Sequence, residues 1–142
     1  LVSLPAGDPA GPVPLAEVLE KRLALPEPGD SVRNNVARIA REFGRELVVA
    51  YEVRSIAAIK NLIARGAALG ILPMGTVLDE ARAGSLVARP IVDPPIRRTL
   101  FLAFSRKRPP LRCETALTAL IREAVVGLAE AVGTLGHPLQ RP

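Results

Sequence analysis

The chain has 142 residues, which fits one domain or one domain and a fraction. Its hydrophobic content of 49% is ample for a core, but aromatic residues make up only 3%, so the interior must be aliphatic. The net charge of +5 comes almost wholly from arginine, with 16 Arg against 3 Lys. Because these arginines are scattered among acidic neighbours and no aromatic residues are interleaved with them, direct nucleic-acid binding by this chain is not expected.

No apolar run approaches the roughly 18 residues that a membrane-spanning helix needs, so no membrane partner is expected. The first twelve residues lack the charged and apolar regions of a signal peptide. The chain does not start with Met, so we expect it to be part of a longer protein. Cys113 is the one cysteine, which rules out a disulfide within the chain and fits a reducing, cytoplasmic setting.

The first third of the chain alternates loops with short elements. Residues 5–14 are rich in proline and glycine and predict a loop, after which Pro14 starts a short helix. A short apolar strand is expected over 22–25. After a proline-rich turn, apolar residues recur at helical spacing and predict a helix that ends at Gly44, with Asp30 or Ser31 as its N-cap.

The middle of the chain repeats this alternation. The β-branched run at 47–53 is typical of a buried strand. Ser55 caps the next helix, which places Ile56, Ile59 and Ile63 on one face. The later expected elements are a strand at 69–72, a helix from 76 to 84 opened by a capping box of Thr76 and Asp79, a strand at 86–91, a crossover at 93–95, a strand at 99–104 and a helix at 114–132 with Leu117, Ile121, Ala124, Leu128 and Val132 facing inward.

Strands that alternate with helices of this length predict an α/β fold with a Rossmann-like, mostly parallel sheet flanked by helices. Ligands bind such sheets outside the carboxyl ends of the strands. No catalytic set stands out: His137 is the one histidine, and there is no glycine-rich nucleotide motif. An enzyme is therefore disfavoured, and neither a cofactor nor a metal is expected.

What remains is a binding site where strands end and helices begin. Free N–H groups and the dipole at helix N-termini attract anions, and Arg54 would add a full positive charge. The alternative is that Ser31 and Ser55 only cap their helices, that Pro73 only stops a strand, and that Arg54 is a solvated strand end. The residues expected to line the site are Asp30, Ser31, Arg54, Ser55, Ile56, Pro73 and Met74.

A series of motifs resembles the effector-binding domain of LysR-type bacterial transcription regulators over residues 1–128. The family pattern of a strand ending in Glu-Val-x-Ser, a helix ending in Gly and a strand ending in Leu-Pro is matched by 52–55, Gly66 and 72–73. Other matching segments are Leu25-Pro26 followed by Val32-Arg33, the stretch 83–87, the stretch 89–95 and the stretch 98–103. Ala68 departs from the family, which commonly has Gly there.

The resemblance implies a type 2 periplasmic-binding-protein fold, in which two α/β lobes enclose a small-molecule cleft. Residues 1–19 are assigned to the end of the first lobe and the crossover, 20–94 to the second lobe, 95–132 to a return strand and helix of the first lobe, and 133–142 to a flexible tail. The rest of the first lobe would lie outside this chain.

The resemblance also implies the function and the partners. The expected partners are a small-molecule effector, further copies of the chain in a dimer or tetramer, and promoter DNA, the last only through an N-terminal helix-turn-helix absent from these residues. Ser31, Ser55 and Arg54 would meet an anionic group of the effector, while Ile56 and Met74 would form an apolar wall. A solute-binding protein of the same fold, or an enzyme built on it, are the alternatives.

Overall fold

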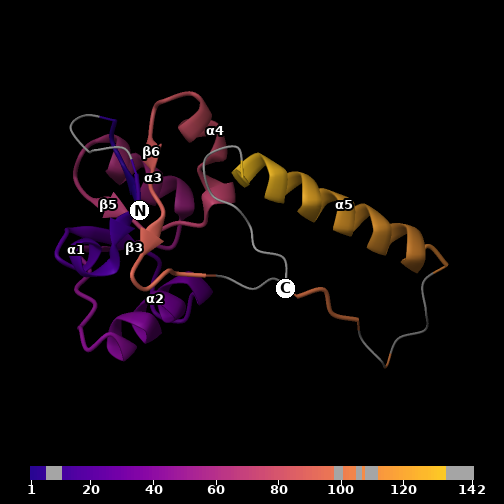
Figure 1. Cartoon of the computed structure of the whole chain (residues 1–142), viewed down its shortest axis with the longest axis horizontal. Coiled ribbons are helices and arrows are strands. Elements are labelled where there is room, and N and C mark those ends of the chain that lie inside the picture. Colours follow the sequence, from indigo (N-terminus) through magenta and orange to yellow (C-terminus); the bar gives the residue numbers. More distant parts are fainter. Residues whose placement is uncertain (6–10, 98–100, 105–106, 108–111, 134–142) are drawn as a thin grey trace. The chain divides into compact units, whose positions relative to one another are not determined.

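The computed structural model describes residues 1–5, 11–97, 101–104, 107 and 112–133 (Figure 1). The chain divides into two units, Leu1–Ile96 and Arg97–Pro142. The first unit is built from strands and helices, whereas the described part of the second contains one long helix, α5, at Glu114–Gly133.

Five strands of the first unit form one sheet, in the order β4-β3-β5-β1-β6. Within it, β3 runs parallel to both β4 and β5, and β1 runs antiparallel to both β5 and β6. Strands β2 and β7 form a separate parallel pair. The strands are β1 Val2–Ser3, β2 Val13–Pro14, β3 Leu23–Leu25, β4 Tyr51–Glu52, β5 Leu69–Gly70, β6 Val87–Ala88 and β7 Ile91–Val92. The expected α/β fold with a mostly parallel sheet is confirmed.

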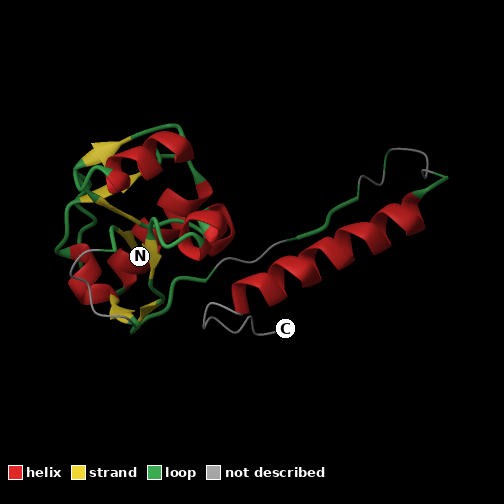
Figure 2. Ribbon diagram, turned by 90° about the horizontal axis from the view of Figure 1, so that it is seen from above, coloured by secondary structure: helices red, strands yellow, loops and turns green. Residues whose placement is uncertain are grey.

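Helices cover both faces of this sheet (Figures 1 and 2). They are α1 Leu15–Leu19, α2 Ser31–Glu42, α3 Ile56–Ala64, α4 Leu78–Arg82 and the short 3₁₀ helix η1 Met74–Thr76. Successive residues of β3 point to opposite faces, as strand geometry requires. Leu23 and Leu25 join the core under α1 and α2, while Ala24 joins the core under α3.

Helix α3 packs very closely on β5. A Cβ atom added to Gly70 would lie 2.6 Å from Cδ1 of Ile63 and 3.4 Å from Cγ2 of Ile59. Both isoleucines are fully buried, so the helix rests almost directly on the strand backbone. Since glycine offers no side chain, this close approach of helix and strand depends on Gly70.

Strand β1 brings the first residues of the chain into the same sheet as residues 23–88. The nitrogen of Leu1 donates to the carbonyl of Arg89, and the nitrogen of Arg89 donates to the carbonyl of Leu1, both at 2.7 Å. The Arg89 guanidinium is buried and donates to the carbonyls of Gly11 and Pro12.

The division of the chain into two lobes stays a prediction.

Three predicted strands differ from the observed ones. The strand expected at 69–72 ends at Gly70. The run at 47–53 is shorter and only half-buried, because β4 is the edge strand and Val48 is 68% exposed. The strand expected at 86–91 is broken into β6 and β7, which belong to different sheets. Pro90 cannot donate a hydrogen bond, and the partner strand changes there, from β1 for β6 to β2 for β7.

Three further expectations are corrected. The capping box does not form: the Thr76 hydroxyl lies inside η1 and donates to the Pro73 carbonyl at 2.7 Å, and α4 begins without a side-chain cap. Residues 101–104 form no strand, and Thr99 and Leu100 lie outside the described residues. In α5 only Val132 is buried among the residues expected to face inward, since Leu117 and Leu128 are both exposed.

Candidate functional site

The carboxyl ends of three neighbouring strands meet at one edge of the sheet. Because β4, β3 and β5 are adjacent and parallel, the segments that follow them emerge side by side. These segments lead into α2, α3 and η1 respectively after β3, β4 and β5. They carry all seven of the residues predicted to line the site, so the structure brings the predicted set to the same edge.

The two helix N-termini at this edge are capped differently. Asp30 caps α2, because its Oδ1 accepts from the nitrogen of Val32 at 2.7 Å. Ser55 caps α3 through a longer contact with the nitrogen of Ala58, at 3.4 Å. Ser31 is the first residue of α2, and its hydroxyl makes no hydrogen bond within the described part of the chain. Asp30, Ser31 and Ser55 are all exposed, so a ligand can reach them.

Arg54 lies at the same edge but is already paired. Its Nε donates to Oε2 of Glu27 at 2.8 Å, and its side chain is 86% exposed. Glu27 belongs to the segment after β3 and Arg54 to the segment after β4, so this ion pair links the two. Arg54 is therefore accessible, but a ligand anion must compete with Glu27 for it.

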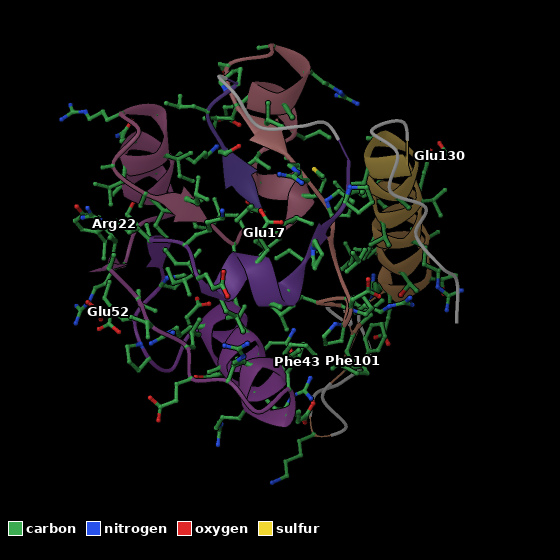
Figure 3. All side chains as sticks on the ribbon, turned by 60° about the vertical axis from the view of Figure 1, so that its left-hand side comes forward. Glu17, Arg22, Phe43, Glu52, Phe101 and Glu130 are labelled. Atoms are coloured by element: carbon green, nitrogen blue, oxygen red, sulfur yellow. The ribbon has the colours of Figure 1, made fainter. Side chains whose placement is uncertain are left out.

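Arg33 is a second cation near this edge, and the sequence did not single it out as a site residue. Its side chain is only 14% exposed, and Nη2 lies 3.4 Å from Oε1 of Glu52. Its Nε and Nη1 atoms are buried and have no hydrogen-bond partner. Glu52 lies on edge strand β4, at the periphery of the molecule (Figure 3). The available signal was the position of Arg33 in the first turn of a helix that faces a neighbouring strand end.

The apolar residues of the predicted set do not behave alike. Ile56 is 40% exposed, whereas Ile59 and Ile63 are fully buried, so Ile56 does not share their core-facing role. Met74 is partly buried and packs on the core under α3. Helix α4, which follows η1, is tied to α3 by a hydrogen bond from Lys60 to Glu80, and this bond lowers the pKa of the Glu80 carboxyl.

The charges at the edge are mixed. Arg33 pairs with Glu52 and Arg54 with Glu27, and the Asp30 carboxylate that caps α2 is a third acidic group, so carboxylates outnumber these arginines. Within the described residues, no group of three or more His, Cys, Asp or Glu side chains is placed to hold a metal ion. None of the helices in that part of the chain has the length and hydropathy to span a membrane.

The chain is similar to known transcription regulators. It is 26% identical over 127 residues to the HTH-type transcriptional regulator BbuR of Bordetella bronchiseptica, covering 89% of this chain and 39% of that protein. It is 28% identical over 100 residues to the DNA-binding transcriptional dual regulator OxyR of Escherichia coli K12, covering 70% of this chain and 32% of that protein. The chain thus spans about a third to two-fifths of the length of these relatives.

The fold has a solved counterpart. The crystal structure of the reduced form of OxyR matches 94% of this chain and 58% of its own, with a TM-score of 0.59 and 24% sequence identity. The model of the family described as "LysR substrate binding domain" matches residues 3–126. This is a family of effector-binding domains of transcription regulators and not a family of enzymes. The chain belongs to the LysR substrate-binding domain family.

Proposed function

We propose that this chain is the effector-sensing part of a LysR-type regulator and that it binds a small anionic metabolite at the shared carboxyl edge of β4, β3 and β5. The observation that carries the proposal is the convergence at this edge of two helix N-termini, an exposed arginine and the turn before η1. Ser31, Ser55 and Arg54 would receive the anionic group, and Ile56 and Met74 would contact its apolar part.

The effector would act through a difference in affinity. A ligand that binds a closed cleft better than an open one shifts the population toward the closed form by that difference. In this proposal residues 20–94 form the second lobe, and the other wall of the cleft comes from a first lobe to which residues 95–132 contribute. The signal would pass through a dimer or tetramer to helix-turn-helix domains on promoter DNA, in the cytoplasm.

The relatives suggest one alternative way of sensing. Two matching Escherichia coli proteins are named hydrogen peroxide-inducible genes activator, and the solved OxyR structure is described as a reduced form. In the present chain Cys113 is the single cysteine, so no disulfide can form within residues 1–142. Noncovalent binding of a metabolite is therefore the mode of sensing that we propose.

The full-length protein is the proper test, because the cleft needs both lobes. Calorimetric titration with a panel of small carboxylates and a matched panel of small amines should find binding among the carboxylates. Arg54→Ala should weaken that binding by about tenfold. This loss is at the lower end of what a hydrogen bond to a charged group contributes, because Arg54 is exposed. Arg65→Ala, an exposed arginine at the opposite end of α3, serves as the matched control and should leave binding unchanged. Binding confined to amines, or equal affinity in Arg54→Ala and the parent, would refute the site.

A further inference from the structure

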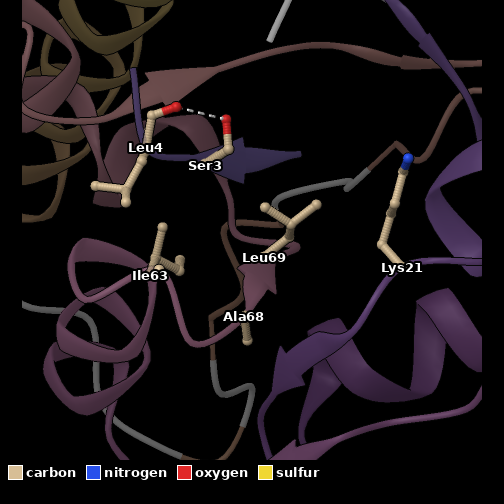
Figure 4. Close-up of a pocket in the computed structure, with 7 residues that line it drawn as sticks. Ser3, Leu4, Lys21, Ile63, Ala68 and Leu69 are labelled. Carbon is tan, nitrogen blue, oxygen red and sulfur yellow. Dashed lines mark hydrogen bonds between the residues drawn. The ribbon is translucent and has the colours of Figure 1, made fainter. Parts of the chain in front are cut away.

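A pocket lies at the opposite end of the sheet from the proposed effector site. It has a volume of about 260 Å³ and is lined by Ser3, Leu4, Lys21, Ile63, Gly66, Ala68 and Leu69 (Figure 4). The topology explains why these residues meet. Lys21 precedes β3, and residues 68–69 begin β5, so both mark the amino ends of parallel strands. Because β1 is antiparallel to β5, its carboxyl end, with Ser3 and Leu4, reaches the same place.

The lining combines an apolar wall with two polar groups. Leu4, Ile63, Ala68 and Leu69 provide the apolar surface, and Leu69 stands between Ile63 and Lys21 in Figure 4. Ser3 is 3% exposed, and its hydroxyl makes a long hydrogen bond of 3.2 Å to the carbonyl of the next residue, Leu4. Because this bond is long, the hydroxyl can turn its single proton from the Leu4 carbonyl to an acceptor on a bound molecule.

Lys21 supplies the charge at the rim of the pocket. Its Nζ lies 3.5 Å from Glu17, and both side chains are nearly half exposed, so this ion pair is weak and readily exchanged. The carbonyls at the C-terminus of α3 are satisfied, since those of Asn61, Leu62 and Ile63 accept from the nitrogens of Arg65, Ala67 and Gly66. The pocket therefore offers one cation and one buried hydroxyl above an apolar wall.

We infer that this pocket is a second small-molecule site, which takes a compact monocarboxylate with an apolar chain. The volume lies just below the range of about 300–1,000 Å³ of pockets for drug-sized ligands, so the site suits a smaller molecule such as a branched six-carbon acid. The chain of the ligand lies against Leu4, Ile63 and Ala68, and its carboxylate accepts from Lys21 and Ser3. The pocket is separate from the proposed effector site at the carboxyl edge of the sheet. A test of one site therefore does not decide the other.

The test uses the 142-residue chain labelled with ¹⁵N and titrated with 4-methylpentanoate, its neutral counterpart 4-methylpentan-1-ol, and acetate, which lacks the chain. The amide resonances of Leu4, Gly66 and Ala68 should shift on addition of 4-methylpentanoate. They should shift less on addition of the alcohol. Acetate at the same concentration should leave them in place. Absence of shifts at these amides with 4-methylpentanoate would overturn the inference.

Two variants locate the ligand. Ala68→Leu fills the pocket and should abolish the shifts at Leu4 and Gly66, while Ala64→Leu, at an exposed position of α3 outside the lining, should retain them. Lys21→Gln should weaken 4-methylpentanoate binding by about fivefold and leave binding of the alcohol unchanged. Lys21→Arg should restore binding of the acid. Because Lys21 is at the surface, this comparison holds even if Ala68→Leu does not fold. Equal binding of the acid by Lys21→Gln and the parent would rule out the assigned carboxylate contact.

Discussion

Arg54 and Glu27 connect the segments that follow two adjacent parallel strands, with Arg54 Nε 2.8 Å from Glu27 Oε2. The Glu27 carboxylate is paired with the guanidinium on which the proposed anion site depends. An exposed pair of this kind contributes about 0–1 kcal/mol to stability. Its importance therefore lies in competition with a ligand rather than in holding the fold.

The first prediction concerns that competition. Glu27→Gln removes the competing carboxylate and should raise the affinity of the full-length protein for the proposed anionic effector by about twofold to fivefold, the equivalent of a surface ion pair. Stability in urea should change by less than about 1 kcal/mol. Calorimetry on the variant and the parent measures the first quantity. Glu42→Gln, which breaks the exposed Arg38–Glu42 pair on α2, is the control and should not alter affinity. Weaker effector binding in Glu27→Gln would contradict the competition.

The second prediction concerns Arg33 and Glu52, which contribute unequally to stability. Removing Glu52 leaves a largely buried guanidinium with no carboxylate, whereas replacing Arg33 by an apolar residue removes the two unpaired nitrogens as well. Glu52→Gln should thus destabilise the chain by about 1 kcal/mol or more, and Arg33→Met should cost less or even stabilise it. Urea unfolding of both variants gives the comparison. A larger loss of stability in Arg33→Met than in Glu52→Gln would mean that the Arg33 nitrogens have hydrogen-bond acceptors in solution.

The third prediction concerns the contact between α3 and β5. Gly70→Ala places a methyl group 2.6 Å from Cδ1 of Ile63, so that side chain must move, at a cost of about 1–3 kcal/mol. Ile63→Val removes this Cδ1 atom and alone should cost about 0.5–1.5 kcal/mol. The double variant should lose less stability than the sum of the two single losses, because each change relieves the other. Additive losses would show that helix α3 shifts as a whole instead.

The fourth prediction concerns pH. In the polypeptide that begins at Leu1, burial is the main cause that lowers the pKa of the free amino group from 8.0 to about 5, and the charge of Arg89 adds to it. Between these values the unfolded chain binds a proton that the folded chain does not, so the contribution of this group to stability falls as the pH drops from 8 to 5 and is constant outside that window. The slope reaches up to about 1.4 kcal/mol per pH unit.

Acetylation of Leu1 isolates this effect, because it removes the titrating group and leaves the rest of the chain unchanged. Urea unfolding at pH 5.5 and pH 8.5 should show a larger difference for the free chain than for the acetylated one. If the two forms lose the same stability, another group is responsible.

The sequence predicted best where local signals and tertiary packing agree. Helices α2 and α3 were placed closely because capping residues, helical spacing and glycines mark their ends, and the range of α5 followed from helical spacing. The sequence also predicted which edge of the sheet carries the site residues, since the carboxyl ends of parallel strands in α/β folds lie together.

The errors arose where a partner distant in sequence decides the outcome. The hydrophobicity of residues 47–53 did not reveal that β4 is an edge strand, because strand order is a property of the whole sheet. The break between β6 and β7 arises because β6 pairs with β1 and β7 pairs with β2, and both partner strands are far away in sequence. The pairing of Arg54 with Glu27 and the burial of Arg33 likewise required the neighbouring loops, so the competition for the cation was invisible in the sequence.

The position of β1 has a consequence for how the protein is made. Val2 pairs with Gly70 in β5 and Ala88 in β6, and the bond between Leu1 and Arg89 joins residues 88 positions apart. At about 5–20 residues per second, a ribosome needs roughly 4–18 s to supply these partners. During that time the backbone N–H and C=O groups of Val2 and Ser3 lack the strands that pair with them in the folded sheet. The order of synthesis therefore means that this sheet cannot be completed until the residues that form β5 and β6 have been made.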